Sequence, residues 1–296
     1  MAAQDLNRGA RSLKPRRGSR IVWLSSVANR IVGQLLRSAF GEHVASAVLS
    51  NKVIRRVLTS PVNALVACEG CLFLVERGMD VGFCLFDGYE EPVRRVLRPS
   101  EGDVVIDVGA FISRYAITAA KAVGPDGLVV AIEPHPANFK ILMKNVRLNR
   151  LNNVICLNCA AWDRDGHLTL YESAWSGYHG PLAQVARSYI KVRAKKLDSI
   201  AEELGLRKVD WAKIDVEGAE LRVLKGMRNI LRRNRGRLKL MIEVHGPERA
   251  RRCEEELRAL GYKVKLMRDF HVRITRVLQP LLFRVPSTWL FAVARR

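Results

Sequence analysis

Residues 104–113 read VVIDVGAFIS, and this stretch is the strongest indication of the fold class. A short β-branched run carries Asp107 near its end, and Gly109 follows where a tight turn leads into a helical stretch. In open α/β sheets a ligand lies at the carboxyl end of such a strand, and a glycine lets it approach the backbone. A dinucleotide site requires G-x-G-x-x-G, which brings amides to a pyrophosphate. Phe111 and Ser113 stand where further glycines would be, so the sequence favours a cofactor without phosphates.

From residue 101 onward, short β-branched runs alternate with helical stretches, which predicts βαβ units and a doubly wound α/β domain. Residues 262–267 and 288–294 read as two strands with no long helix between them. Such a closing pair, whose last strand inserts antiparallel into a mostly parallel sheet, is typical of Rossmann-like methyltransferase sheets rather than dinucleotide-binding ones. The other elements we expect are strands over 104–108, 128–133, 154–160, 211–216 and 238–244, and helices over 113–122, 136–149, 220–233 and 247–260.

The residues that precede this domain divide into segments of different character. Residues 1–20 are basic and almost free of large apolar side chains, which predicts a flexible arm. From residue 21 to about 59 the apolar residues recur at helical spacing, as in an amphipathic helix that covers its own protein or lies on an anionic membrane. In 70–86, two apolar runs, CLFLV and VGFCLF, flank a glycine and predict a hairpin. We therefore expect an N-terminal helical and hairpin extension over 21–100 and a methyltransferase-like domain over 101–296.

The charge balance is strongly basic, with 50 Lys and Arg against 29 Asp and Glu and a net charge of +21. A field of this sign attracts polyanions such as nucleic acid, anionic membranes or acidic glycans. Seven basic residues and no acid lie between Lys225 and Lys239, although cations at a helix C-terminus or in solvent would also explain this run. No apolar stretch reaches the ~18 residues of a membrane span, and no secretion signal is visible. We expect a cytoplasmic protein, with peripheral membrane association through the basic N-terminus as an alternative.

Two acids indicate which cofactor to expect. S-adenosylmethionine presents an amino acid, a sulfonium and an adenosine, so its site needs one carboxylate near the cationic end and another near the ribose hydroxyls. Asp107 and Glu133 lie at the ends of adjacent predicted strands and are placed for these two tasks. Either acid alone could cap a helix or a turn. Together they favour binding of S-adenosylmethionine.

These motifs in combination resemble the FkbM family of methyltransferases, and the likeness extends over most of residues 70–246. It rests on Tyr89-Glu90 and on the segments DVGAFISRYAITAA, IEPHPANFKILMKNVRLN, AAWDRDG, KLDSI, KIDVEGAE and IEVH. The resemblance implies a methyltransferase fold, transfer of the methyl group of S-adenosylmethionine, and usually a hydroxyl acceptor. By position it also implies that the cofactor is lined by Asp107, Gly109, Ala110, Phe111, Ser113, Glu133 and Pro134, with Asp163 near the adenine.

The chain departs from the family's D-V-G-A-N-I-G pattern at Phe111 and Ser113. A bulky residue tolerates a positive φ poorly, so the backbone of this loop decides whether the cofactor site is intact. A chain impaired at this loop would be a polyanion-binding protein built on a methyltransferase fold. That is the non-enzymatic alternative.

Methyl transfer is an in-line displacement, so the enzyme has to align the acceptor and remove its proton. Two predicted strand ends offer a base: Asp215 and Glu217 follow the fourth strand, and Glu243 and His245 end the fifth. Within each pair the residues are two apart and share a face. His245 is the leading base because its unperturbed pKa is near neutral, and Asp215 is the second choice or the residue that orients it. The alternative is that these side chains only fix a turn or a loop.

The segment between the third and fourth predicted strands contains Trp175, Tyr178 and His179 among several glycines. Such loops often supply a substrate wall, and its aromatic rings could stack on a sugar or a base or form a lid over the core. We expect a hydroxyl on a small molecule, lipid or glycan as the acceptor. An RNA methyltransferase is the alternative, with phosphate contacts from the basic arm, the 225–239 cluster and the arginines at 249–252.

Two cysteine pairs were considered as metal ligands, Cys68-x-x-Cys71 and Cys156-x-x-Cys159. Paired zinc knuckles are usually separated by ~15–20 residues, and the gap here is far longer. The second pair also lies in a predicted strand, where a three-residue offset sends the two thiols to opposite faces. We therefore expect no metal site.

Overall fold

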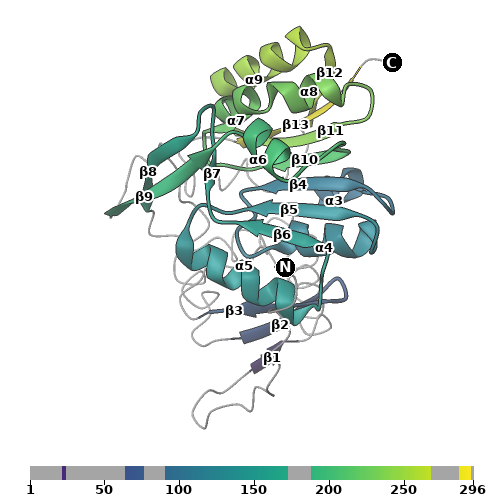
Figure 1. Ribbon diagram of the computed structural model, residues 1–296, viewed down its shortest axis with the longest axis vertical. Helices are drawn as coiled ribbons and strands as arrows, with labels where there is room; N and C mark the ends of the chain where they lie inside the picture. The colour runs from purple at the N-terminus through teal and green to yellow at the C-terminus, as the bar shows by residue number, and fades with distance from the viewer. Residues whose placement is uncertain (1–21, 25–63, 77–90, 173–187, 268–286, 295–296) are drawn as a thin grey trace, which may run out of the picture.

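The computed structural model describes residues 22–24, 64–76, 91–172, 188–267 and 287–294. A seven-stranded sheet forms its centre, in the order β12, β13, β11, β10, β4, β5, β6 (Figure 1). β4, β5, β6, β10 and β11 pair in parallel, whereas β13 runs antiparallel between β11 and β12. The strands are β4 (Val104–Val108), β5 (Leu128–Ile132), β6 (Val154–Leu157), β10 (Trp211–Ile214), β11 (Lys239–His245), β12 (Tyr262–Met267) and β13 (Ser287–Ala294). This arrangement confirms the doubly wound sheet with an antiparallel last strand.

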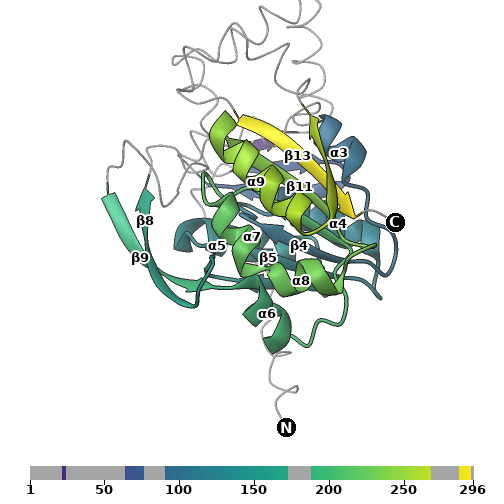
Figure 2. The ribbon, with the colours of Figure 1, turned by 90° about the horizontal axis from the view of Figure 1, so that it is seen from above.

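Helices cover both faces of this sheet (Figure 2). Ile106 and Val108 of β4 pack into a core with α6 to α9, whereas Val105 packs with α4 and α5 on the other face. Alternate residues of a strand point to opposite faces, and both faces of β4 are buried, so the strand reads as a continuous apolar run. The helices are α3 (Glu91–Val96), α4 (Arg114–Val123), α5 (Pro136–Leu148), α6 (Leu197–Glu203), α7 (Glu220–Gly226), α8 (Arg228–Arg233) and α9 (Pro247–Ala259).

The single helix predicted over 220–233 is two helices in the structure, because the backbone leaves helical geometry at Met227 (φ −123°, ψ 21°). Gly226 ends the first of them against the carbonyl of Trp162, and a Cβ at this position would lie 1.9 Å from that oxygen. The chain therefore bends where it passes the loop after the third strand. Periodicity alone does not reveal such a contact.

A small sheet in the order β1, β2, β3 lies on the outer side of α5 (Figure 1). Its strands are Val22–Leu24, Ala64–Cys68 and Cys71–Val75. The prediction of helix from residue 21 is wrong for 22–24, which pair in parallel with β2. Val-Trp-Leu favours a strand by side-chain type, and pairing with β2 outweighs the helical spacing. The remainder of that predicted helix lies outside the described residues.

The hairpin of this sheet differs from the predicted one. CLFLV is β3, but its antiparallel partner is the preceding strand β2, with which it pairs from Cys68↔Cys71 to Ala64↔Val75. The turn consists of Glu69 and Gly70, both with positive φ (52° and 71°), which suits the tight turns that match the twist of a hairpin. The run at 81–86, predicted as the partner, lies outside the described residues.

A third sheet, in the order β7, β9, β8, extends beyond the main one and was not predicted. It consists of β7 (Ala160–Ala161), β8 (Gly166–Glu172) and β9 (Ser188–Lys195), the last two antiparallel. The predicted strand over 154–160 is therefore divided between β6 and β7. No helix among the described residues is long and apolar enough to cross a bilayer.

The order of the main sheet determines where a ligand can lie. The chain passes from β4 outward to β5 and β6, then crosses to β10 on the other side of β4. Successive connections therefore diverge between β4 and β10. In sheets of this kind ligands bind in the crevice at the carboxyl ends of the strands at this point.

Candidate active site

The turn after β4 brings the carboxyl ends of three strands together. The amides of Gly109 and Ala110 both donate to the carbonyl of Ile132 at the end of β5, at 2.9 and 3.0 Å. On the other side, the amide of Asp215 donates to the carbonyl of Val108 at 3.0 Å. Gly109 has φ +76°, and a Cβ on it would lie 1.8 Å from the carbonyl oxygen of Asp215. Only glycine fits at this position, both for its backbone angle and for the close approach of β10.

Asp107 lies at the bottom of this crevice and is only 1% exposed. Neither of its carboxylate oxygens has a hydrogen-bond partner in normal geometry among the described residues. Burial raises the pKa of this carboxyl, and the attraction of Lys213 and the Ala116 amide offsets that effect only in part. A buried carboxylate with unused oxygens is costly unless a cation or a donor reaches it. Asp107 is therefore suited to receive a cationic ligand group.

Lys213 is a cation beside Asp107 that was not predicted as a site residue from the sequence. It stands opposite Asp107 in the β4–β10 register, and its ammonium lies 3.9 Å from Asp107 Oδ1 and 3.2 Å from Asp215 Oδ2. The same ammonium lies 4.8 Å from the centre of the Tyr115 ring. The sequence feature that could have identified it is a lysine inside the otherwise apolar strand Trp211–Ile214. A buried lysine of this kind usually has an acidic partner across the strand pair.

Glu133 follows β5 and is also buried, at 5% exposure. Its carboxylate accepts hydrogen bonds from the amides of Phe111 and His135, both at 2.9 Å, and from the Asn138 side chain at 3.4 Å. Burial raises the pKa of Glu133 to about 7 against the opposing effect of these bonds. A carboxylate offers about four acceptor positions, so three of them are in use. The Asn138 bond is the longest and would be the first to yield to a ribose hydroxyl.

The two departures from the family pattern adopt the unusual backbone that the turn requires. Phe111 has φ 49° and Ser113 has φ 85°, so both lie in the left-handed region. Ser113 is fully buried, and its hydroxyl donates to the Ile112 carbonyl. The amide of Phe111 is bound by Glu133. The loop therefore keeps a shape suited to glycine and asparagine while it carries side chains that fit this shape poorly.

The four predicted catalytic residues come from β10 and β11 and the segments that follow, as expected. His245 lies between two acids, with Nε2 3.5 Å from Glu217 and Nδ1 3.8 Å from Glu220. Burial opposes a charge on this imidazole, but Glu220, Glu217, Glu243 and Asp215 outweigh that effect and raise its pKa to about 10. This raised pKa favours the imidazolium form of His245 at neutral pH, and the role of His245 as the base stays a prediction.

Glu217 becomes the better candidate for a base. Burial raises its pKa to about 8, with repulsion from Asp215 and Glu220 in the same direction and with His245 and Lys213 opposing it. Its backbone has φ 50°, so the turn presents this side chain at some conformational cost. Glu220, at the start of α7, is fully buried and was not singled out from the sequence. One of its oxygens accepts the Gly218 amide at 2.7 Å, and the other has no partner among the described residues.

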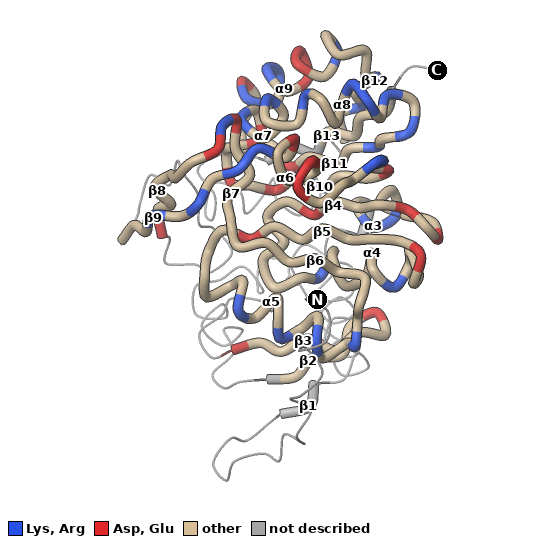
Figure 3. Tube along the Cα trace, viewed as in Figure 1, with Lys and Arg blue, Asp and Glu red and all other residues tan. Residues whose placement is uncertain are grey.

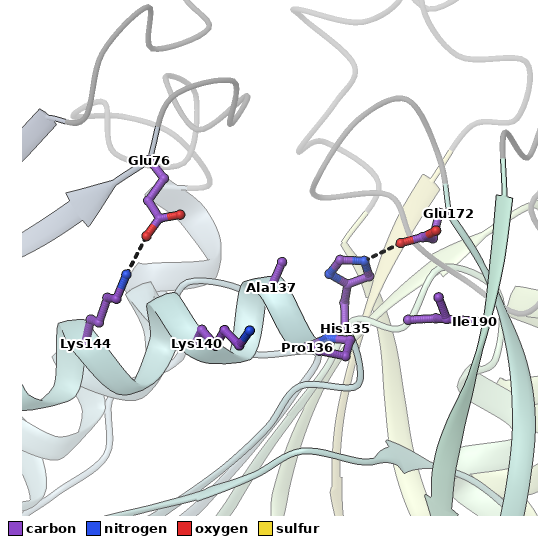
Figure 4. Close-up of a pocket in the computed structure, with 8 residues that line it drawn as sticks. All are labelled: Glu76, His135, Pro136, Ala137, Lys140, Lys144, Glu172 and Ile190. Carbon is purple, nitrogen blue, oxygen red and sulfur yellow. Dashed lines mark hydrogen bonds and ion pairs between the residues drawn. The ribbon is translucent and has the colours of Figure 1, made fainter.

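A pocket of about 440 Å³ opens beside the N-terminus of α5 (Figure 4). His135 points into it and bonds Glu172 of β8 at 2.8 Å, and Lys144 pairs with Glu76 at 2.6 Å on the opposite wall. The amide of the same His135 bonds Glu133, so the pocket adjoins that acid. The lining residues are Glu76, His135, Pro136, Ala137, Lys140, Lys144, Glu172 and Ile190.

The remaining predicted site residues do not form a single group. The Pro134 carbonyl accepts the Asn158 side chain at 3.0 Å, beside Glu133. Asp163 forms an ion pair with Arg222 of α7 at 2.6 Å, and its place near an adenine stays a prediction. Trp175, Tyr178 and His179 lie outside the described residues. Among the residues that are described, no group of three or more His, Cys, Asp or Glu side chains has the geometry of a metal site.

Three relatives are similar in sequence to part of this chain. The chain is 31% identical to the hexuronic acid methyltransferase AglP of Haloferax volcanii, over 49% of this chain and 58% of the relative. It is 30% identical to the 31-O-demethyl-FK506 methyltransferase FkbM of Streptomyces tacrolimicus, over 44% and 61%. It is 39% identical to a tRNA(Phe) (4-demethylwyosine(37)-C(7)) aminocarboxypropyltransferase of Methanocaldococcus jannaschii, over 29% and 33%. The match thus spans between a third and three fifths of these relatives' length.

A family model covers more of the chain than any of these pairwise matches. The model for the methyltransferase FkbM domain matches residues 107–264, which is more than half of the sequence. The match begins at Asp107 and includes β5, β10, β11 and the acids that follow them. The chain therefore belongs to the FkbM methyltransferase domain family.

Proposed function

We propose that this protein is a methyltransferase that uses S-adenosylmethionine and acts on a hydroxyl group. The observation that carries the proposal is the buried carboxylate of Asp107 at the carboxyl end of β4, beside β10, where Lys213 lies 3.9 Å away and neither carboxylate oxygen has a hydrogen bond among the described residues. The ammonium of the cofactor's methionine part would donate hydrogen bonds to this carboxylate. Membership in the FkbM family supports the same cofactor.

The residues present fit this cofactor at both ends. Asp107 would accept its amino group, and Gly109 leaves space at the turn for a ligand to approach the backbone. Glu133 would accept a ribose hydroxyl in place of the long bond from Asn138. When bound, the cofactor supplies a methyl group activated by its sulfonium. The protein's own task is to hold the acceptor in line and to receive its proton.

Proton removal is assigned to Glu217 rather than to His245. A general base works best with a pKa close to the operating pH, and the pKa of Glu217, raised to about 8, meets that condition. His245 would act as a positioning residue, because its imidazolium stands between Glu217 and Glu220 and favours the ionised form of Glu217. Asp215 is the second candidate for the base, since it lies beside Lys213 at the same edge.

The relatives, rather than the 440 Å³ pocket, support the hydroxyl acceptor, because the pocket adjoins Glu133 and the proposed ribose site. Its lining contains none of Asp215, Glu217, Glu243 and His245. The names of the two relatives, a hexuronic acid methyltransferase and a 31-O-demethyl-FK506 methyltransferase, agree with a hydroxyl acceptor. The tRNA-modifying relative keeps RNA as the second candidate, together with the net charge of +21.

Labelled methyl transfer tests the proposal. The purified protein is incubated with S-adenosylmethionine labelled at its methyl group and with separate glycan, lipid, small-molecule and RNA fractions of a cell extract. We expect label in the glycan or small-molecule fraction, and loss of this signal in Asp107→Asn. The Arg251→Gln variant, at an exposed position on α9, is the control and should retain it. Label in RNA alone would replace the hydroxyl proposal by the second candidate, and label in no fraction would contradict both.

A further inference from the structure

The amino end of the parallel strands, opposite the active site, carries a dense group of basic side chains. We name it the arginine edge and define it as Arg207, Arg232, Arg233, Arg235, Arg237 and Lys239. All six side chains are exposed. Figure 3 shows the basic segments gathered where α8 leads into β11. Arg207 lies in the loop before β10, and the other five extend from the last turn of α8 to the start of β11. Asn234 joins these two segments by accepting the Val209 amide at 2.9 Å.

Helix-end chemistry explains only part of this group. Arg232 and Arg233 lie in the last turn of α8, where cations are favourable. Arg235 and Arg237 lie beyond the helix, and Lys239 begins β11. The helix dipole effect fades within one turn, so it does not account for these three.

The arginine edge has little acidic compensation among the described residues. Asp210 lies 3.7 Å from Arg237, but it also lies 3.5 Å from Lys208 and accepts the Val104 amide at 2.9 Å. The guanidinium of Arg235 lies over Gly261, and the ammonium of Lys239 lies 4.7 Å from the centre of the Trp211 ring. By contrast, Arg251 on α9 contacts two acids, Glu248 and Glu255, at 2.8 and 2.5 Å. Like charges held together in this way attract a polyanion.

The arginine edge is separate from the proposed active site. β11 begins at Lys239 on this edge and ends at His245 in the acid cluster, six residues later. A strand rises about 3.3 Å per residue, so the two edges are roughly 20 Å apart. A ligand on the arginine edge therefore does not block the crevice beside Asp107. Figure 1 shows the two regions at opposite ends of the strands.

We propose that the arginine edge binds the phosphate backbone of a nucleic acid. Five of its six residues are arginine, whose planar fork pairs with phosphate oxygens through two hydrogen bonds. Membrane binding usually adds apolar side chains that enter the lipid. The exposed large apolar residues among the described ones are Leu148, Tyr171 and Tyr189, which lie on α5, β8 and β9. This chemistry favours nucleic acid over a lipid surface, and it does not depend on methyl transfer.

Two triple variants with the same change in charge test the proposal. Arg232→Gln/Arg233→Gln/Arg235→Gln alters the arginine edge, and Arg251→Gln/Arg252→Gln/Arg258→Gln removes three exposed arginines from α9. Binding of a fluorescent 20-nucleotide RNA is measured from 50 to 300 mM salt, and thermal unfolding checks that each variant folds. We expect the first variant to lose about tenfold or more in affinity and to show a salt slope shallower by about two. The second should change less than about twofold.

Equal losses in the two variants, or no loss in either, would overturn the proposal, because the basic charge of the whole chain would then explain all binding. Vesicles of phosphatidylcholine with 30% phosphatidylserine form a second arm. Binding to vesicles that depends on the arginine edge, without such dependence for RNA, would overturn the assignment to nucleic acid. Labelled methyl transfer in the first variant shows whether the proposed activity persists, so failure of one proposal is distinguishable from failure of the other.

Discussion

At the scale of single residues, the active-site turn depends on backbone angles that most side chains disfavour. Gly109, Phe111 and Ser113 all have positive φ within five residues. Two of them carry side chains, so the chain holds conformational strain at the place where the cofactor is proposed to bind. The strain is balanced locally, because Glu133 bonds the Phe111 amide and Ile132 bonds those of Gly109 and Ala110.

The first prediction concerns Gly109. Gly109→Ala adds a Cβ that would lie 1.8 Å from the Asp215 carbonyl, in addition to the cost of φ +76°. We expect a loss of more than about 3 kcal/mol in the free energy of unfolding, measured in urea. Gly205→Ala is the control, since it has φ +63° and open space around it. A loss for Gly109→Ala no larger than the control's would show that the strands are not in close contact.

The second prediction concerns Ser113, which has φ 85° and stands where the family has glycine. Ser113→Gly removes the Cβ that makes this angle costly, so stability should rise by about 0.5–1 kcal/mol despite the greater freedom of the unfolded chain. Ser113→Ala keeps the Cβ and should give no gain. The measurement is the midpoint of thermal unfolding for both variants. A lower midpoint for Ser113→Gly than for Ser113→Ala would contradict the account.

The third prediction concerns the pH dependence of kcat/KM. Glu217 has to be ionised to accept a proton, and its pKa is raised to about 8, so the rate should rise with pH up to that value. His245 has to stay protonated, and its pKa of about 10 sets the fall at higher pH. Glu217→Gln should abolish the rise, whereas Lys225→Gln on the exposed side of α7 should leave the profile unchanged. A rise centred near pH 6.5 in the wild type would restore His245 as the base.

At the scale of elements, side chains as well as strands join the layers. Asn145 of α5 is fully buried, and its side chain bonds the amide and carbonyl of Leu74 at 2.6 and 3.3 Å and the carbonyl of Ile112 at 3.0 Å. Asn149, one turn later, bonds the amide and carbonyl of Leu72 at 2.9 and 2.6 Å. These two asparagines connect the small sheet to α5.

The fourth prediction tests this connection. Asn145→Ala leaves the amide and carbonyl of Leu74 without their side-chain partner and removes one of the bonds to the Ile112 carbonyl, so we expect a loss of about 2–4 kcal/mol in the free energy of unfolding. Lys144→Ala removes the exposed ion pair with Glu76 and should cost less than about 1 kcal/mol. Urea unfolding measures both variants. Similar values for the two would mean that the small sheet is not held through α5.

The elements that sequence could predict are those whose local pattern matches their environment. β4 and β12 are predicted with the bounds that the structure shows, because β4 is a mainly apolar run after a turn and β12 begins with alternating apolar and lysine residues after a turn. The break at Met227 and the pairing of β2 with β3 depend on contacts with distant residues, which a local pattern does not contain. In the candidate site, Asp107 and Glu133 could be predicted because each lies at the end of a predicted strand. Lys213 and Glu220 could not be predicted, because their roles depend on contacts with Asp107 and His245, which are distant in the sequence.

At the scale of the whole molecule, the two ends of the parallel strands differ in chemistry. The carboxyl end holds the buried acids around Lys213 and His245, and the amino end of β11 opens on the arginine edge. The positive net charge of +21 therefore does not extend to the proposed active site, where acidic side chains outnumber basic ones. The proposed sites for a cationic cofactor and for a polyanion therefore lie at opposite ends of the strands and do not overlap.

Calorimetric titration of the protein with S-adenosylmethionine tests directly whether Asp107 receives the cofactor. We expect saturable binding at one site per chain, and a loss of affinity of about tenfold or more in Asp107→Asn, which keeps the shape of the side chain and removes its charge. Absence of binding by the wild-type protein at millimolar cofactor, or equal affinity in Asp107→Asn, would contradict the claim that this buried carboxylate receives the cofactor.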